Sequence, residues 1–495
     1  MNDVFRAEYE AGRGQVVHAI GVADLETPVA AYLKLGFGRA NSCLLESVEG
    51  GAARGRYSII GIAPDLIWRC RGSTAEISRD GGAFVAQPGA ALDSLRAVLA
   101  DSRLDVPDGL PPMCGGLVGY LGYDMVRLME RLPDKNPDPL GLPEAWLVRP
   151  TLFAIFDTVR DALTLAAPVH PRAGVTADQA WNEAHERIAQ ARAALARMLP
   201  TPETTALTAP LPEPVSNLGR EGYMAAVERA KEYIRAGDVF QVVPSQRFSV
   251  PFALHPFALY RALRRTNPAP FLFYLDFGEF AVVGSSPEIM VRLRDGEVTI
   301  RPLAGTRPRG ATHVEDERLA ADLLADPKER AEHLMLLDLG RNDVGRVAEI
   351  GSVRVVESFA IERYSHVMHM ASDVRGRLRP GLDALDALIA GFPAGTLSGA
   401  PKVRAMEIID ELEPVRRGIY AGCIGYFAAD GTMDTCIGLR TAVVKDGVLY
   451  AQAGAGIVAD SDPASEYAEC VQKARALIRA AEEAIRFGNE SVPGS

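Results

Sequence analysis

The stretch "FLFYLDFGEFAVVGSSPEIMVRL" (residues 271–293) carries the pattern that best defines the fold. It consists of short β-branched and aromatic runs, which are typical of strands. "GVLYAQAGAGIV" (447–458) has the same character, as do "RYSIIGIAPDLIWRCRG" and "TLFAIFDTV" nearer the N-terminus. Such runs predict a protein rich in β-structure.

Helical stretches lie between these strands. They are expected at about 177–198, 314–340, 383–390, 401–412 and 463–487, and a further helix should end at Gly237 before a strand that begins near Val239. Strands and helices come in blocks and do not alternate strictly as βαβ units. This order predicts an α+β fold with antiparallel sheets.

A proline-rich segment divides the chain. Residues 200–214, "PTPETTALTAPLPEP", contain five prolines and almost no large apolar side chain, which is the composition of a linker. We therefore expect an N-terminal region at 1–198, a linker at 199–218 and a larger region at 219–490.

The totals exclude several classes of protein. The 495 residues include 53 basic and 64 acidic side chains, and the net charge of −11 argues against nucleic acid or an anionic membrane as a main partner. There is no apolar run of about 18 residues and no signal-peptide core at the N-terminus. Six scattered cysteines form no CxxC pair. A cytoplasmic protein with reduced cysteines is expected.

Two pairs of glutamates point to a metal. Glu329 and Glu332 follow Asp326-Pro327 at the start of one expected helix, and Glu466 and Glu469 follow Asp462-Pro463 at the start of another. Capping and the helix dipole can explain the first acid of a pair. The second acid shares its helix face, where like charges repel unless a cation lies between them. Because oxygen ligands suit a hard cation and no His/Cys cluster suggests zinc, Mg²⁺ is the expected ion.

Five long motifs resemble those of the chorismate-utilising enzymes, in order and in spacing. They are "RPLAGTRPRG" (301–310), "KERAEHLMLLDLGRND" (328–343), "RYSHVMHM" (363–370), "FPAGTLSGAPKVRAMEIIDELE" (392–413) and "GAGIVADSDPASEYAEC" (454–470). The resemblance covers nearly the whole chain. It implies a sandwich of antiparallel sheets with flanking helices and a Mg²⁺-dependent reaction on chorismate.

The same resemblance implies roles for individual residues. Glu332 and Glu469 would hold Mg²⁺ directly, and Glu329 and Glu466 would do so directly or through water. The expected catalytic residues are Glu288, as general acid for the departing hydroxyl, His369, and Thr396. The expected substrate-binding residues are Gly305, Thr306, Tyr420, Arg440, Gly454, Ala455, Gly456 and Lys473.

Two positions predict which nucleophile is used. Relatives that use water resemble one another in a lysine base where this chain has Gln241, and those that make aminodeoxychorismate carry a lysine where it has Ala304. Both differences favour direct attack by ammonia, and hence anthranilate and pyruvate as products. Two alternatives stay open: an aminodeoxyisochorismate synthase that does not eliminate pyruvate, and a non-catalytic tryptophan-binding regulator on the same scaffold.

Two further segments resemble the family's feedback element. "LLES" (44–47) and "NPAPFLF" (267–273) predict an L-tryptophan site formed by Glu46, Ser47, Pro270, Phe271 and Leu272. No glutaminase domain is seen in the 495 residues, so a separate glutamine amidotransferase subunit is the expected source of ammonia.

Overall fold

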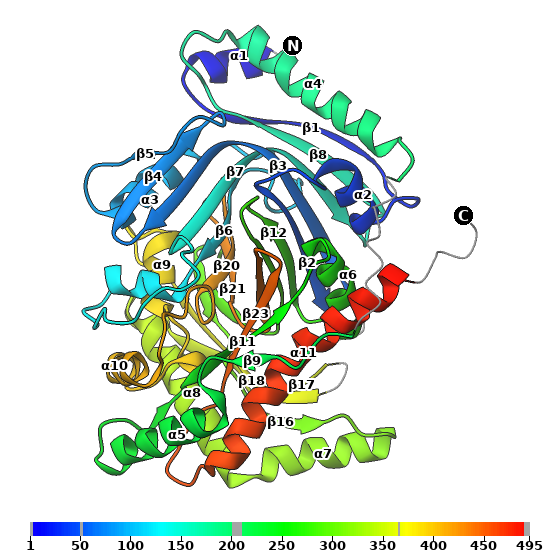
Figure 1. Cartoon of the computed structure of the whole chain (residues 1–495). Helices are drawn as coiled ribbons and strands as arrows, with labels where there is room; N and C mark the ends of the chain where they lie inside the picture. Colours follow the sequence, from blue (N-terminus) through cyan, green and yellow to red (C-terminus); the bar gives the residue numbers. More distant parts are fainter. Residues whose placement is uncertain (1–2, 50–52, 200–209, 365–366, 490–495) are drawn as a thin grey trace.

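The computed structural model describes residues 3–49, 53–199, 210–364 and 367–489. Figure 1 shows a broad, curved sheet with helices on its outer faces. The strands of the first half of the chain are β1 (Gln15–Val22), β2 (Ser42–Glu49), β3 (Ala53–Arg71), β4 (Thr74–Arg79), β5 (Val85–Ala86), β6 (Gly116–Leu121), β7 (Ala145–Asp157), β8 (Ala162–Val169), β9 (Val215–Ser216), β10 (Gln241–Val242) and β11 (Ser245–Pro251).

The remaining strands follow in the second half of the chain. They are β12 (Phe271–Asp276), β13 (Ala281–Ser286), β14 (Ile289–Arg294), β15 (Glu297–Ile300), β16 (Leu303–Pro308), β17 (Arg354–Arg363), β18 (Val367–Arg377), β19 (Gly399–Ala400), β20 (Cys423–Ala428), β21 (Met433–Ile437), β22 (Thr441–Lys445) and β23 (Val448–Gly454).

The helices occur between and after these strands. They are α1 (Asp3–Glu10), α2 (Pro28–Leu35), α3 (Ala91–Asp101), α4 (Ala177–Leu195), α5 (Gly219–Arg235), α6 (Pro256–Thr266), α7 (His313–Ala325), α8 (Pro327–Gly345), α9 (Ala384–Gly391), α10 (Lys402–Leu412) and α11 (Pro463–Asn489), with short 3-10 helices η1 (Tyr123–Leu128) and η2 (Gly395–Leu397). The α+β class with a large antiparallel sheet is confirmed.

The stretch at 271–293 connects two parts of this sheet. Strand β12 turns at Gly278, whose φ of +82° favours glycine, and pairs antiparallel with β13. The chain then leaves that ladder at Ser286-Pro287: β13 also pairs with β22, whereas β14 pairs with β21. The predicted strands are thus present, and the break between β13 and β14 places Glu288 at a junction in the sheet.

Strands from before and after the proline-rich segment are hydrogen-bonded to each other. Strand β2 pairs with β12, and β6 pairs with β20, both antiparallel. The regions before and after residues 199–218 therefore share one sheet, and the division of the chain there stays a prediction. Residues 200–209 lie outside the described ranges.

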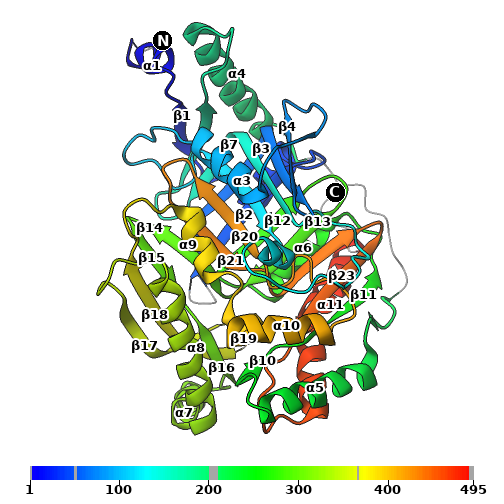
Figure 2. The same cartoon turned by 90° about the vertical axis from the view of Figure 1, so that its left-hand side faces the viewer.

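Apolar side chains fill the space between sheet and helices and the concave interior. Phe153 on β7, Phe273 on β12 and Ile424 on β20 belong to a core enclosed by strands. Other cores lie under α2, α6 and α11 and under α3, α8 and α9. Figure 2 shows α8, α9 and α10 on one side of the molecule, with α5 below α10. The helices that carry the glutamate pairs, α8 and α11, are thereby fixed against the sheet.

Three expectations of local structure can be compared directly. The expected helix at 314–340 is two helices, because Asp326 ends α7 and its side chain caps α8, accepting from the amides of Lys328 and Glu329. The strand expected from Val239 is divided into β10 and β11 at Val243-Pro244. The helix expected to end at Gly237 is α5, which ends at Arg235.

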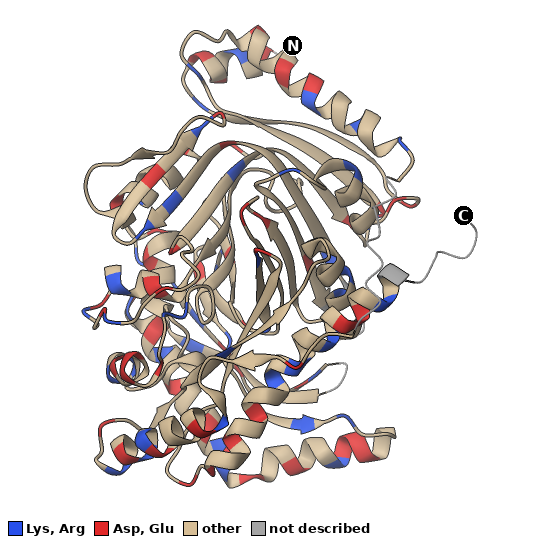
Figure 3. Cartoon of the chain, viewed as in Figure 1, with Lys and Arg blue, Asp and Glu red and all other residues tan. Residues whose placement is uncertain are grey.

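Charged side chains of both signs lie on several helices, and the cysteines lie in the interior. Figure 3 shows acidic and basic residues intermixed along α4, α5 and α7. All six cysteines are buried and unpaired in the described structure. None of the helices in the described ranges combines the length and apolar character that a membrane crossing needs.

Candidate active site

Glu288 lies at the junction between β13 and β14 and is only 7% exposed. The Thr396 hydroxyl donates to its carboxyl oxygens at 3.1 and 3.2 Å, and the Leu303 amide donates at 3.4 Å. Burial raises the pKa of Glu288 to about 8, against the smaller opposing effects of Leu303, Thr396 and Arg440. A carboxyl group with this pKa carries a proton at neutral pH, as a general acid must.

The four glutamates of α8 and α11 lie near enough to one another for their charges to interact in pairs, and we call them the carboxylate cluster. Burial raises the pKa of Glu332, and the charges of Glu329 and Glu469 add to the rise. Burial likewise raises the pKa of Glu466, with Glu469 contributing. Two helices that start far apart in the sequence therefore direct like charges toward one region.

Three members of the cluster are paired with another side chain of the protein. Glu329 pairs with Arg307 at 3.2 Å, Glu332 accepts from the Gln241 amide at 3.1 Å, and Glu469 pairs with Lys473 at 2.8 Å. In the described residues no three His, Cys, Asp or Glu side chains converge as a ready metal cage. The cluster still fits a hard cation, because its donors are carboxylate oxygens, and burial together with neighbouring carboxylates raises the pKa of Glu332 and Glu466.

His369 on β18 is fixed by the turn at Gly305. Its Nδ1 lies 2.9 Å from the Gly305 carbonyl and 3.1 Å from the Thr306 hydroxyl. Burial lowers the pKa of His369 to about 4, so the imidazole is neutral at pH 7. With Nδ1–H donating to the carbonyl, Nε2 carries the free lone pair and can accept a proton.

Gly305 itself allows this close approach. Its φ is +68°, and a Cβ there would lie 2.9 Å from side-chain atoms of Leu323 and Met370 and 3.1 Å from Glu329 Oε2. Any other residue would be strained in the backbone and crowded by α8. The glycine thus brings the strand of the expected ring pocket next to the carboxylate cluster.

Arg440 is a charged neighbour of Glu288. Its charge lowers the pKa of Glu288, and partial burial lowers its own pKa. Its carbonyl accepts from the Ser285 amide at 3.1 Å, and its φ of +49° is unusual for a non-glycine residue. A guanidinium so placed could pair with a substrate carboxylate.

The expected anion cradle at Gly454–Gly456 is partly engaged. The Ala455 amide donates to the Tyr223 hydroxyl at 3.2 Å, and Lys473 Nζ donates to the Gly454 carbonyl at 3.1 Å. Burial raises the pKa of Tyr420, whose hydroxyl contacts the Gly454 backbone. The structure therefore gathers Tyr420, Gly454 and Lys473 near the carboxylate cluster, with Tyr223 as a neighbour that sequence reasoning missed.

A second site is formed where β2 pairs with β12, and we call it the β2–β12 cavity. It has a volume of about 900 Å³, and all five residues predicted to bind tryptophan line it: Glu46, Ser47, Pro270, Phe271 and Leu272. Ser47 lies opposite Phe271 and Glu46 opposite Leu272 in the strand register. The cavity also reaches Pro287 and Ile289, which flank Glu288 in the chain.

The carboxylate of Glu46 is already bound by other side chains. Arg264 donates to it at 2.6 and 3.0 Å, Ser58 donates at 3.3 Å, and the Tyr260 hydroxyl is also hydrogen-bonded to it. Sequence reasoning missed Tyr260 and Arg264. The available signal was their spacing of four residues on α6, which places both on one face of that helix.

Known proteins match most or nearly all of this chain. A family model for chorismate binding enzymes matches residues 48–479. Anthranilate synthase component 1 of Cereibacter sphaeroides is 58% identical over 494 residues, 99% of each chain. The protein of the same description from Pseudomonas putida is 51% identical over 93% of each chain.

A solved structure gives the same result at the level of the fold. The crystal structure of anthranilate synthase component I from Streptococcus pneumoniae superimposes with a TM-score of 0.77 at 37% identity, covering 93% of this chain and 99% of that one. The family match, the identities and the shared fold agree. The chain therefore belongs to the family of chorismate binding enzymes and, within it, groups with anthranilate synthase component 1.

Proposed function

We propose that this protein converts chorismate and ammonia to anthranilate and pyruvate, as the large subunit of an anthranilate synthase. The observation that carries the proposal is the buried, protonated Glu288 held by Thr396 in a chain 58% identical to such a subunit. In this reaction the C4 hydroxyl must leave as water, and a carboxyl group that keeps its proton at neutral pH can supply the proton.

Magnesium is the proposed cofactor. Glu332 and Glu469 would hold it, assisted by Glu329 and Glu466, and when bound it would neutralise the ring carboxylate of the substrate. The mutual charge of the cluster supports this assignment, because four carboxylates at two helix starts need compensation beyond Lys473 and Arg307.

Other side chains would bind and orient the substrate. Arg440 and Tyr420 are proposed to bind the enolpyruvyl carboxylate, with Gly454 and Gly456 contributing backbone amides. Thr306 and Gly305 would line the ring pocket. The charge of Arg440 acts on Glu288, which supports the proposal that both side chains contact one substrate molecule.

His369 favours the complete reaction over an aminodeoxyisochorismate synthase. Loss of pyruvate needs a base for the proton at C2, and a neutral imidazole whose Nδ1–H is held by Gly305 presents Nε2 for that purpose. The preserved set of Glu288, His369 and Arg440 also argues against a non-catalytic regulator.

Ammonia is the proposed nucleophile. Gln241 and Ala304 have no amino group that could act as a base or attack the ring. A separate glutamine amidotransferase subunit is proposed to supply ammonia, as the designation component 1 of the relatives suggests. The buried, unpaired cysteines fit a reducing compartment, and we propose the cytoplasm.

L-Tryptophan is proposed as a feedback inhibitor that binds in the β2–β12 cavity. The cavity is lined by Ser47, Phe271 and Leu272, which offer backbone and packing contacts to an indole ring. Its extension to Pro287 and Ile289 would bring the inhibitor close to Glu288.

One assay tests reaction and regulation together. Purified protein is mixed with chorismate, Mg²⁺ and a high concentration of ammonium, and anthranilate fluorescence and pyruvate are followed with and without L-tryptophan. Both products should form in equal amounts, and tryptophan should reduce the rate. Folded protein that forms neither product would refute the assignment, and an amino product without pyruvate would favour the aminodeoxyisochorismate synthase.

A further inference from the structure

Arg417 is a buried arginine in the turn between α10 and β20, and none of the proposed roles uses it. It is 3% exposed, and its side chain pairs with the equally buried Glu413 at 2.6 Å. Glu413 in turn accepts from the amide and the hydroxyl of Ser245, both at 2.8 Å. The charge of the guanidinium is therefore neutralised within this group.

Only part of the guanidinium is occupied by Glu413. Nη1 donates to the Leu397 carbonyl at 2.7 Å, and Nη2 donates to the Val243 carbonyl at 2.6 Å. The guanidinium also lies 5.5 Å from the centre of the Tyr420 ring. One side chain thus contacts backbone segments that lie 20 and 174 residues away from it in the sequence.

Each of these segments leads directly to the candidate active site. Leu397 follows Thr396, which donates to Glu288. Val243 is two residues after Gln241, which donates to Glu332. The third segment carries Tyr420 itself. Arg417 therefore contacts three segments of the expected site. One carries Thr396, which bonds the general acid, and one carries Gln241, which bonds the carboxylate cluster. The third carries Tyr420, which is expected to bind the substrate carboxylate.

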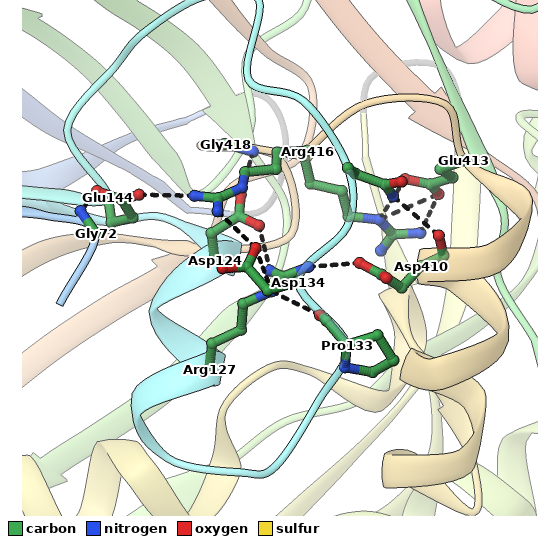
Figure 4. A network of polar contacts seen from close by, with 12 residues as sticks. Gly72, Asp124, Arg127, Pro133, Asp134, Glu144, Asp410, Glu413, Arg416 and Gly418 are labelled. Carbon is green, nitrogen blue, oxygen red and sulfur yellow. Dashed lines mark hydrogen bonds and ion pairs between the residues drawn. The ribbon is translucent and has the colours of Figure 1, made fainter.

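The turn that carries Arg417 is also held by a network around Asp124 and Arg127 (Figure 4). Asp124 accepts from the Gly418 amide at 2.8 Å, and Arg127 joins Asp124 to Asp410, at 2.6 Å from the latter. Gly418 has a φ of +62°. Since this network fixes the turn without Arg417, the bonds to Leu397 and Val243 are not needed merely to keep the turn in place.

We infer that Arg417 is a positioning residue for the proposed reaction, which sets Thr396, Gln241 and Tyr420 relative to one another through the carbonyls of Leu397 and Val243. A lysine could not replace it, because its three donors radiate from one atom and cannot reach Glu413 and both carbonyls in the same fork geometry. The inference rests on the proposed function.

The test compares Arg417→Lys with Arg416→Lys in the ammonia-dependent assay, with Thr396→Val as the reference for a lost Thr396 contact. Arg416 is the matched control, because it is an adjacent arginine whose side chain bonds Asp134 at 2.5 Å and Glu144 at 3.0 Å, away from the site (Figure 4). Rate and chorismate KM are measured from pH 6 to 10, well below each melting temperature.

The hydroxyl of Thr396 lowers the pKa of Glu288, so displacing it should shift the alkaline limb of kcat to higher pH. Arg417→Lys should lower kcat about 10-fold, raise the chorismate KM and shift the limb upward as Thr396→Val does, by roughly half a pH unit. Arg416→Lys should show neither the loss nor the shift.

A lowered melting temperature with an unshifted limb and an unchanged KM would overturn the inference, because it is the result of a purely structural salt bridge. If Arg417→Lys does not fold, the double variant Glu413→Met/Arg417→Met removes both charges at similar volume and should show the same shift. A wild-type protein without activity would refute the proposed function instead.

Discussion

Buried acids have different neighbours in the carboxylate cluster and in the β2–β12 cavity. In the cavity, Glu46 is bound by Arg264, Tyr260 and Ser58, so its charge is fully compensated inside the protein. In the cluster, the pKa of Glu332 is raised by burial and by two other glutamates. Glu46 is paired with an arginine, whereas Glu332 accepts from the neutral amide of Gln241 and is close to two further acids. The same residue type is therefore compensated by other side chains in one place and is available to a metal in the other.

The largest effect is expected from Glu332→Ala, which should abolish measurable turnover at ordinary Mg²⁺ because a direct ligand is lost. The matched control is Asp338→Ala on the same helix, where the acid is exposed and pairs only with Arg341. Anthranilate fluorescence is measured over a range of Mg²⁺ concentrations. Full activity of Glu332→Ala would contradict the distinction between the two regions.

Glu288→Gln should lower kcat by about 10²- to 10⁴-fold, the usual contribution of a general acid, because the amide keeps the shape but has no acidic proton. The Mg²⁺ concentration for half-maximal activity should change little, since Glu288 is not part of the cluster. A large change in the required Mg²⁺ concentration as well as in kcat would mean that Glu288 and the carboxylate cluster do not act separately.

Filling the β2–β12 cavity should weaken inhibition. Ser47→Tyr places a large ring where the cavity wall is formed by Ser47 and Phe271, and the tryptophan concentration for half inhibition should rise about tenfold or more, about 1.4 kcal/mol. Each rate is compared with that of the same variant without tryptophan. Unchanged inhibition would place the tryptophan site elsewhere.

The smallest effect concerns pH. Burial raises the pKa of Glu288 to about 8. Its carboxyl group is therefore protonated well below that pH and loses its proton as the pH rises through it. The kcat of the wild type should therefore fall to half near pH 8 and decline further above it. In Glu288→Gln the residual rate should lack this limb, and a limb that persists there would assign it to another group.

Much of the local structure followed from the sequence, and the long-range contacts did not. Asp326 and Asp462 were predicted to start helices, and both side chains accept from the first turn. The same Asp326 also ends α7, which a pattern of apolar residues across 314–340 could not reveal. The five residues predicted to bind tryptophan come from two segments more than 200 residues apart, and only the resemblance to the family's motifs predicted that they form one site.

The partners of the site residues were beyond sequence reasoning for a physical reason. Thr396 meets Glu288 across 108 residues, Arg417 meets Val243 across 174, and Tyr223 meets Ala455 across 232. Each bond depends on how the sheet bends and where its helices pack, and neither propensity nor spacing encodes that. The position of Arg264 next to Glu46 is of the same kind.

The strand pairing described above has a consequence for handling the protein in the laboratory. Each half of the chain supplies strands that the other half needs, through β2 with β12 and β6 with β20. Neither half expressed alone could cover those open edges, and each would present them to other chains. Two halves expressed together could pair these strand edges with each other. A break between the halves is therefore a suitable place for a split-protein reporter whose signal is fluorescence of the product.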